Sequence, residues 1–179
     1  RIKHRRIMAL EPEILFINSD YIKRYTNLNN SVQDDVIKPA VVVAQDKYVQ
    51  EYLGTDLYNK ILADIEASTL TGNYLSLVND YVLKVAMWWT MVELLPNLET
   101  QVDNGGLFTR ISEDAQPSDN QNVYSLRSMA RDNAQFYTKR MVSYLCDNST
   151  LFPEYNSNSG SDMHPNKDPY SQNGIQYSK

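Results

Sequence analysis

The sequence predicts an all-α protein: a small bundle of four to five helices, two of them long, with one projecting loop or short β-hairpin and an extended C-terminal tail. Three observations predict this class. Apolar residues recur at steps of three and four over residues 73–95 and again over residues 123–145, the repeat that places side chains on one face of an α-helix. Shorter stretches with the same repeat come before them and end at a glycine. A strong turn signal separates the two long stretches.

The first long stretch, NYLSLVNDYVLKVAMWWTMVELL from Asn73 to Leu95, predicts the central helix of the bundle. Its 23 residues would span about 35 Å at the usual rise per residue. Pro96 follows the stretch and is expected to end the helix. Because Asp80, Lys84 and Glu93 interrupt the apolar run, we do not expect a membrane-spanning helix. The expected buried face consists of Tyr74, Val78, Tyr81, Val85, Trp88, Val92 and Leu95.

Three shorter helices are expected before the central one. The sequence NSDYIKRYT, which begins at Asn18, predicts a brief first helix with a polar cap. The second helix begins near Val32 or is restarted at Pro39, because proline fits the first turn of a helix. Gly54 is expected to end it in a left-handed conformation. Thr55 then opens the third helix, whose apolar residues again follow a helical repeat.

The segment between the two long helices, residues 101–120, is the least regular part of the chain interior. Its Asn-Gly-Gly sequence is a strong hairpin-turn signal, and we expect a short strand over residues 107–111. Because Leu107 and Phe108 are apolar where a free monomer would expose them, we expect the tip to contact a neighbouring subunit or another protein of the same assembly. The candidate partner-binding residues of this tip are Asn104, Gly105, Gly106, Leu107 and Phe108.

The last helix is expected to begin at Val123 and to end near Asp147 and Asn148, and its outer face carries basic residues. Arg127 and Arg131 are four residues apart and therefore share a face. A solvated face, or a face between subunits, fits such a pair better than a helix that reads a DNA groove. We expect these arginines to form a salt bridge between subunits.

These elements amount to one domain with two extensions. We expect the helical domain at residues 18–155, an N-terminal arm at 1–17 and an extended polar tail at 156–179. The tail has too few apolar residues to offset its own ordering entropy, but isolated anchors along a polar segment can bind a partner. We therefore expect the whole tail to lie off the core in the free protein and along an adjacent protein after assembly. Its candidate partner-binding residues are Tyr170, Ile175 and Tyr177.

Composition narrows the class of protein. Hydrophobic residues make up 42% of the 179 residues and charged residues 22%, with a net charge of -5, which indicates a soluble globular protein without bulk nucleic-acid binding. Thirteen tyrosines against four phenylalanines suit surfaces that become buried on assembly, or reflect drift in composition. The single cysteine, Cys146, excludes an internal disulfide and fits a reducing cytoplasm, and no secretory signal is visible.

The sequence contains no motif for catalysis or cofactor binding. Glycine patterns that cradle phosphates, nucleophile motifs and paired metal ligands do not occur. The two histidines, His4 and His164, lie near the chain ends, and Cys146 has no second thiol nearby. Adjacent acids at residues 34–35 and 113–114 are interpreted as capping or solvated charges. The sequence therefore predicts a protein that is not an enzyme and that has no catalytic residues, metal site or cofactor.

The segment IKPAVVVAQDKYVQEYLGTDLYNKIL, from Ile37 to Leu62, resembles the opening helices of the head-to-tail connector proteins of tailed phages. In that family a proline-started helix has an Ala-Gln-Asp centre, here residues 44–46, and ends in Leu-Gly before a helix bearing Leu-Tyr. The long aromatic helix, the excursion, the second long helix and a closing Asn-x-x-x-Phe-Pro-Glu-Tyr at residues 148–155 keep the same order. The similarity covers roughly residues 20–155 and is closest to the versions in phages of Bacteroidales, including crAss-like phages.

The resemblance implies a structural virion protein that assembles below the portal as a ring of about twelve copies, around the DNA channel of the neck. Its expected partners are further copies of the chain, the portal protein and adjacent neck or tail proteins, with non-specific contact with packaged DNA and no membrane. The protein would be made in the host cytoplasm and would reside in the virion, at the junction of head and tail.

The alternative is a small helical nucleic-acid-binding or regulatory protein. That class would explain the basic sequence RIKHRR at the start of the chain and the arginines of the last helix. It would bind DNA with an affinity that falls as the salt concentration rises. A short basic terminus on an acidic protein is more often a mobile, solvated chain end than a phosphate-binding cluster, so we favour that interpretation of the basic start.

Overall fold

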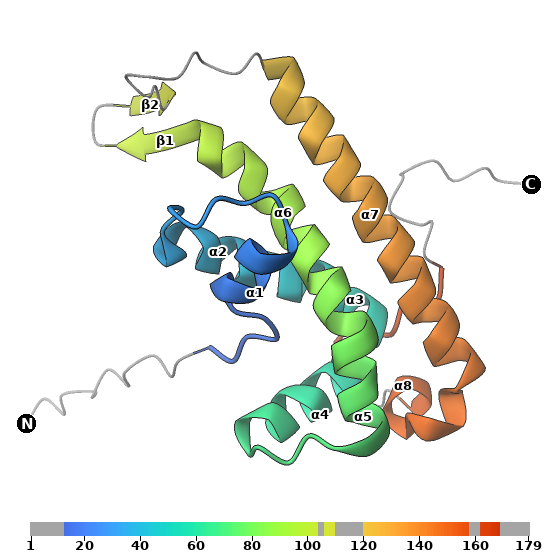
Figure 1. Cartoon of the computed structure of the whole chain (residues 1–179). Helices are drawn as coiled ribbons and strands as arrows, with labels where there is room; N and C mark the ends of the chain where they lie inside the picture. Colours follow the sequence, from blue (N-terminus) through green and yellow to red (C-terminus); the bar gives the residue numbers. More distant parts are fainter. Residues whose placement is uncertain (1–12, 104–105, 110–119, 158–161, 169–179) are drawn as a thin grey trace, which may run out of the picture.

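The computed structural model describes residues 13–103, 106–109, 120–157 and 162–168, and the predicted all-α fold is confirmed (Figure 1). Helices α6 and α7 run antiparallel against each other, and α2 packs on α6. The short helices α4, α5 and α8 gather at one end of the bundle. The elements are α1 (Ser19–Tyr25), α2 (Asp34–Ala44), η1 (Gln45–Val49), α3 (Gln50–Leu53), α4 (Thr55–Glu66), α5 (Gly72–Leu77), η2 (Val78–Val82), α6 (Leu83–Glu99), β1 (Thr100–Asp103), β2 (Gly106–Thr109), α7 (Asn120–Asp147), η3 (Ser149–Leu151) and α8 (Pro153–Ser157).

The chain joins the core before its first helix begins. Phe16 and Ile17 are buried. Gln45 holds this segment: its Oε1 accepts a hydrogen bond from the N–H of Phe16 at 2.9 Å, and its Nε2 donates to the carbonyl of Ile14 at 3.0 Å. The Gln45 side chain is only 1% exposed, so these bonds supply partners that water cannot reach. The domain boundary expected at residue 18 is therefore too late.

Helices α2 and α3 are two parts of one continuous helix, joined by the π-helical turn η1. The helix begins at Asp34, close to the first of its two expected starts, and Pro39 lies inside α2. Gly54 ends it as expected, with a φ of 75°, because glycine adopts positive φ without the steric cost that a side chain brings. Thr55 follows immediately as the first residue of α4.

The central helix likewise joins α5 to α6 through a π-helical turn, η2. We expected Trp88 on the buried face of this helix. Trp88 is only partly buried, whereas its neighbour Trp89 is 2% exposed. A π turn takes in one residue more than an α turn, so it shifts the phase of every later residue relative to a regular helical repeat. Val85 and Val92 of the expected face are nonetheless fully buried, so beyond Val82 the buried face is wider than expected and takes in Trp89.

Trp89 connects three helical segments. Its ring stacks on Tyr48 of η1, with centroids 3.8 Å apart and planes at 7°. Its Nε1 donates a hydrogen bond to Oγ1 of Thr138 on α7 at 3.0 Å, and Thr138 is 1% exposed. A buried indole N–H thus has the partner that its burial requires.

The expected end of the central helix at Pro96 is wrong, because α6 continues through this proline to Glu99. Proline has no N–H, so the carbonyl of Val92, four residues earlier, loses its usual helical donor. Arg127 of α7 replaces that donor: its Nε donates to the Val92 carbonyl at 3.2 Å. Arg127 therefore has a role within its own chain that the sequence did not reveal. The salt bridge expected between subunits stays a prediction.

The segment after α7 closes the lower end of the bundle with aromatic contacts. Phe152 and Tyr155 are fully buried. The Phe152 ring meets Tyr74 of α5 edge to face, with centroids 5.5 Å apart. The Tyr74 hydroxyl donates to Oε2 of Glu154 at 2.7 Å, and burial together with this bond raises the pKa of Tyr74 to about 12. The Phe-Pro-Glu-Tyr sequence thus fastens α8 to the helices beside it.

Candidate interaction surface

The predicted hairpin is present and extends directly from α6. Strand β1 follows Glu99 and pairs antiparallel with β2, with Val102 opposite Leu107. The hairpin lies beyond the bundle, at the end away from α4, α5 and α8 (Figure 1). Of the candidate residues, Gly106, Leu107 and Phe108 lie in β2, whereas Asn104, Gly105, Tyr170, Ile175 and Tyr177 lie outside the described residues.

A row of exposed, large apolar side chains lies on α7. Tyr124 is 70% exposed, Met129 51% and Phe136 62%. Met129 and Phe136 are seven residues apart, which is close to two helical turns, so they project from the same face. Sequence reasoning missed this row, although the signal was available: Met129 and Phe136 lie off the apolar stripe that predicted the buried face of this helix. We call Met129 and Phe136 the α7 row; Tyr124, five residues before Met129, projects from a different face of the helix.

Helices α7 and α1 each carry a pair of aromatic rings in contact. The ring centroids of Phe136 and Tyr137 are 5.3 Å apart, and those of Tyr21 and Tyr25 are 4.7 Å apart. Burial raises the pKa of Tyr21, and the charges of Tyr25 and Tyr137 raise it further. Tyr25 is 58% exposed. A shallow depression of about 310 Å³ on α1 is lined by Asn18, Asp20, Tyr21, Arg24 and Tyr25.

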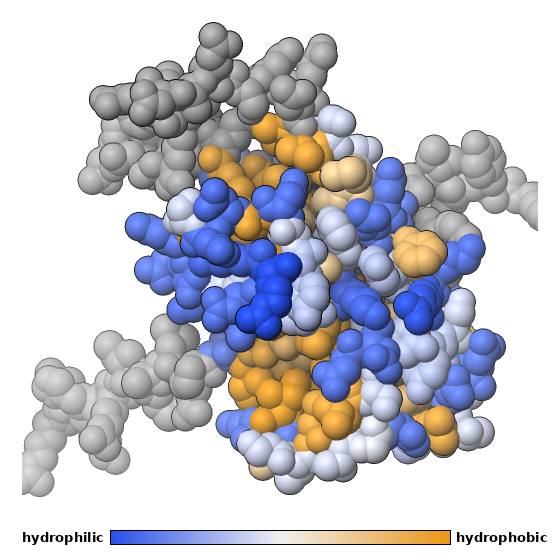
Figure 2. All heavy atoms as spheres, viewed as in Figure 1, coloured by the Kyte–Doolittle hydropathy of each residue, from blue (hydrophilic) through white to orange (hydrophobic). Residues whose placement is uncertain are grey.

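The surface around these rings is mixed in character. Figure 2 shows largely polar residues on the viewed face, with apolar areas over the end of α6 and over α4. Arg131, Lys139 and Arg140 are exposed on α7. The Arg140 guanidinium lies over the ring of Tyr81, 5.2 Å from its centroid, and that ring stacks on Tyr144. The outer side of α7 therefore combines exposed apolar groups with positive charge.

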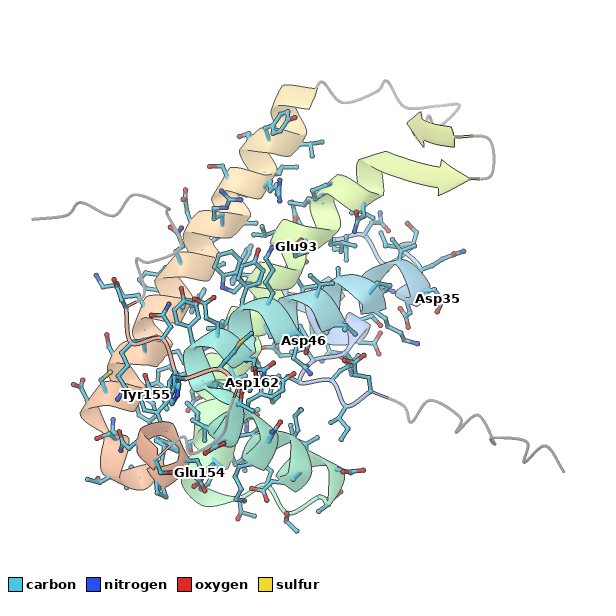
Figure 3. All side chains as sticks on the ribbon, turned by 180° about the vertical axis from the view of Figure 1, so that it is seen from behind. Asp35, Asp46, Glu93, Glu154, Tyr155 and Asp162 are labelled. Atoms are coloured by element: carbon cyan, nitrogen blue, oxygen red, sulfur yellow. The ribbon has the colours of Figure 1, made fainter. Side chains whose placement is uncertain are left out.

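The first part of the predicted tail binds the chain's own helices. Residues 162–168, which we call the strap, lie along the corner where α3 meets α4 (Figure 3). The N–H of Thr55 donates to the carbonyl of Met163, and the N–H of Asn166 donates to the carbonyl of Glu51, both at 2.9 Å. The expectation that the whole tail lies off the core is therefore wrong for this stretch. Backbone groups at the helix corner bind it, and a side-chain pattern does not reveal such groups.

Side chains add to the strap's backbone bonds. Oδ2 of Asp162 accepts hydrogen bonds from Oγ1 of Thr55 at 2.9 Å and from Nε2 of Gln50 at 3.0 Å. Nδ2 of Asn166 donates to Oε1 of Glu51 at 2.8 Å. Gln50, Glu51 and Thr55 thus each make at least one side-chain hydrogen bond to the strap. We call Gln50, Glu51, Gly54 and Thr55 the corner site.

Gly54 allows the strap to approach closely. A Cβ at this position would lie 2.6 Å from Cδ of Pro165, well inside contact distance, and the positive φ already disfavours a side chain. Farther along the strap, Nζ of Lys167 lies 5.0 Å from the centroid of the Tyr155 ring. The sequence predicted Gly54 only as a helix stop, so its contact with Pro165 is a second constraint.

The Gln-Asp pair that supports the resemblance makes contacts within the chain. Nε2 of Gln45 donates to the Tyr58 hydroxyl at 2.9 Å, and that hydroxyl donates to Oδ1 of Asp46 at 3.0 Å. Burial raises the pKa of Tyr58, so its hydroxyl keeps the proton that it donates. These bonds connect η1 to α4 and, through Gln45, to the N-terminal segment.

A second polar cluster connects η1 to α6. Oε1 of Glu93 accepts hydrogen bonds from the Tyr48 hydroxyl at 2.6 Å and from Nζ of Lys47 at 3.1 Å. Burial alone would raise the pKa of Glu93, but the bonds from Tyr48 and Lys47 outweigh it and hold this pKa below its usual value. The carboxylate is thereby kept ionised and paired, which suits a structural contact between helices.

The ionisable residues of the described ranges lie apart or in structural contacts. Within the described ranges, no three or more His, Cys, Asp or Glu side chains are grouped so that they could hold a metal ion. In the same part of the chain, no helix combines the length and apolar character needed to cross a membrane. Asp34 and Asp35 lie in the first turn of α2, and the hydrogen bond from Lys23 lowers the pKa of Asp34. Glu113, Asp114 and His4 lie outside the described residues.

The fold and its surfaces define a small helical protein with a hairpin beyond one end, an exposed apolar row on its longest helix and a strap closed over a helix corner. Residues 49–164 match a family of unknown function, DUF6712, and the chain belongs to that family. The match runs from the end of η1 to the middle of the strap, so it includes the corner site and α7. No curated protein and no solved structure matches the chain.

Proposed function

We propose that this chain is a structural virion protein, a subunit of an oligomeric ring in the neck of a tailed phage. The ring would join the portal and capsid to the tail and surround the DNA channel. The order of short motifs between residues 20 and 155, which resembles that of head-to-tail connector proteins, supports this class. In this proposal the chain has no catalytic role, and its partners are other copies, the portal and adjacent neck or tail proteins.

The observation that carries the proposal is the α7 row. Large apolar side chains gathered on one exposed helix mark protein contact sites, and aromatic residues and methionine are enriched in interface cores. Met129 and Phe136 have this character, share a face of α7 and are more than half exposed. In a ring each copy presents one surface to the copy before it and a different surface to the copy after it, and the series closes by rotation. The α7 row would form one of these two surfaces.

The hairpin supports the same arrangement. It continues α6 without a break and lies beyond the bundle, where a neighbouring subunit or the portal could meet it (Figure 1). Its candidate contact residues, Gly106 to Phe108, pair only with β1 in the described part of the chain. Edge strands of so small a sheet retain unpaired backbone groups that another chain can bind.

Negative-stain imaging of the purified full chain, with and without the portal protein, tests this function. We expect rings in at least one of the two samples. Replacing Met129 and Phe136 together by serine should abolish the rings and leave helix content unchanged. The matched control is Leu75→Ser, which alters an apolar residue of α5 that is 40% exposed, and it should leave the rings intact. Persistent monomers of the unaltered chain in both samples would rule out the ring.

A nucleic-acid-binding role is the second candidate, and the basic residues of α7 favour it. Arg131, Lys139 and Arg140 are exposed, and Arg140 already contacts an aromatic ring. Binding of this kind weakens steeply as salt concentration rises, since phosphate contacts release counterions. DNA binding by a persistent monomer, lost when Lys139 and Arg140 are both replaced by glutamine, would favour this role over the ring.

A further inference from the structure

The strap and the corner site have the properties of a ligand and its receptor. The corner belongs to the rigid core: Tyr52, Leu53 and Leu57 are at most 1% exposed. The strap lies outside that core, with exposed side chains at Asp162 and Met163. The helical backbone of the corner is held by bonds that do not involve the strap: the N–H of Gly54 donates to the Gln50 carbonyl at 2.8 Å, and the N–H of Tyr58 donates to the Gly54 carbonyl at 3.0 Å.

The contacts between strap and corner are specific but mostly polar. Each hydrogen bond replaces one that water would otherwise make, so its net contribution is modest. Three features of the corner select its ligand. Thr55 and Gln50 donate hydrogen bonds to an aspartate, and Gly54, which has no side chain, leaves room for a proline. The backbone carbonyl and the carboxylate of Glu51 accept hydrogen bonds from an asparagine. The recognised segment is an extended Asp-Met-His-Pro-Asn, residues 162–166.

We propose that the corner site is a peptide-binding site which, in the assembled ring, takes the strap of a neighbouring copy in place of its own. This inference rests on the proposed function and names the contact between its subunits. An exchanged strap makes the same bonds to an identical corner, so the exchange needs no new complementary surface. In a closed ring every copy gives one strap and receives one, and the repeated weak contacts reinforce one another.

The length of chain before the strap limits which copy can give it. Four residues separate Ser157, the end of α8, from Asp162, and the five steps between these residues reach no farther than about 18 Å. The receiving corner must therefore belong to an adjacent copy. Helix α8 also packs against α4, so the strap begins close to its own corner, which explains why a single chain closes on itself.

Crosslinking between differently labelled full-length copies tests the exchange. In a Cys146→Ser background, one copy carries Glu51→Cys and the other carries Asn166→Cys and an affinity tag that changes its mass. Neither copy holds both thiols, so a short bifunctional thiol reagent can join residue 51 to residue 166 only between chains. The double variant Glu51→Cys/Asn166→Cys, in a single chain, serves as the control for closure within one chain. The mixture is assembled with the portal protein, crosslinked, and analysed by mass and by imaging.

Each outcome decides between the two proposals. Rings with adducts between residue 51 of one copy and residue 166 of another support both. Rings without such adducts, while the double variant crosslinks within its own chain, overturn strap exchange and leave the ring in place. Adducts without rings support strap exchange and overturn the ring. If neither rings nor adducts form, both proposals are overturned.

Two glycine variants test whether the adducts report the corner site. Gly54→Ala places a Cβ against Pro165 at a positive φ, whereas Gly72→Ala also places a Cβ at a positive φ, of 57°, with nothing within 4 Å. Introduced into the Glu51→Cys copy, Gly54→Ala should lower the adduct yield several-fold and Gly72→Ala should not. Equal yields from both variants would show that the strap is not held at the corner site. Circular dichroism of each variant monitors folding.

Discussion

The contact between Arg127 and the Val92 carbonyl predicts a specific thermodynamic coupling with Pro96. Arg127→Ala removes a charged donor from a carbonyl whose own residue is fully buried. Hydrogen bonds to charged groups contribute about 1.5–3 kcal/mol, so we expect the free energy of unfolding to fall by about that amount. Pro96→Ala restores an N–H that can bond to the same carbonyl. In the Pro96→Ala background, Arg127→Ala should therefore cost about 1–2 kcal/mol less.

Urea unfolding, followed by circular dichroism at constant pH for the four chains of this double-mutant cycle, measures the coupling. Arg131→Ala is the matched control, because it removes an exposed arginine one turn away on the same helix, and it should change stability by less than about 0.5 kcal/mol. If Arg127→Ala costs the same with and without Pro96, the carbonyl does not need the arginine and the explanation of how α6 passes its proline is wrong.

Three further predictions concern buried aromatic and ionisable groups. Trp89→Ala should lower the free energy of unfolding by about 3–5 kcal/mol, and Trp88→Ala by clearly less, in denaturant titrations. Folding lowers the pKa of Glu93, so its ionised carboxylate stabilises the fold above pH 4.5, and this contribution is lost as the pH falls through the lower pKa of the folded state. Glu93→Gln should therefore reduce the loss of unfolding free energy at acid pH, measured by unfolding at a series of pH values. Burial raises the pKa of Tyr58, and that of Tyr74 to about 12, so stability should decline as the pH rises above 10, and a flat profile between pH 9 and 11.5 would contradict this.

Helical periodicity and turn chemistry were enough to predict most of the architecture. The two long helices, the stop at Gly54 and the hairpin after the central helix follow from local patterns, because each depends on neighbours within a few residues. The features that the sequence did not predict depend on distant partners. Pro96 looks like a helix end until Arg127, which is 31 residues later, supplies the missing donor. Trp89 is buried more deeply than Trp88 by contacts with Tyr48 and Thr138, which are both more than 40 residues away in the sequence.

The candidate surface was less predictable than the fold. The sequence indicated the hairpin, but the α7 row was hidden within a helix that also supplies much of the core. Phe16 and Ile17 looked like part of an arm because their partner, Gln45, is a polar residue that gives no hydrophobic signal. The strap looked like a free tail because backbone groups at Glu51 and Thr55 hold it, and neither residue type predicts such a contact.

The number of subunits in the assembled particle tests the ring most directly. Native mass spectrometry of the full chain, alone and with the portal protein, would measure it without any substitution. The proposed function predicts a closed homo-oligomer of about twelve copies, with a mass near 250 kDa from a chain of 20.6 kDa. A chain that stays at 20.6 kDa at every concentration, with and without the portal, would contradict it.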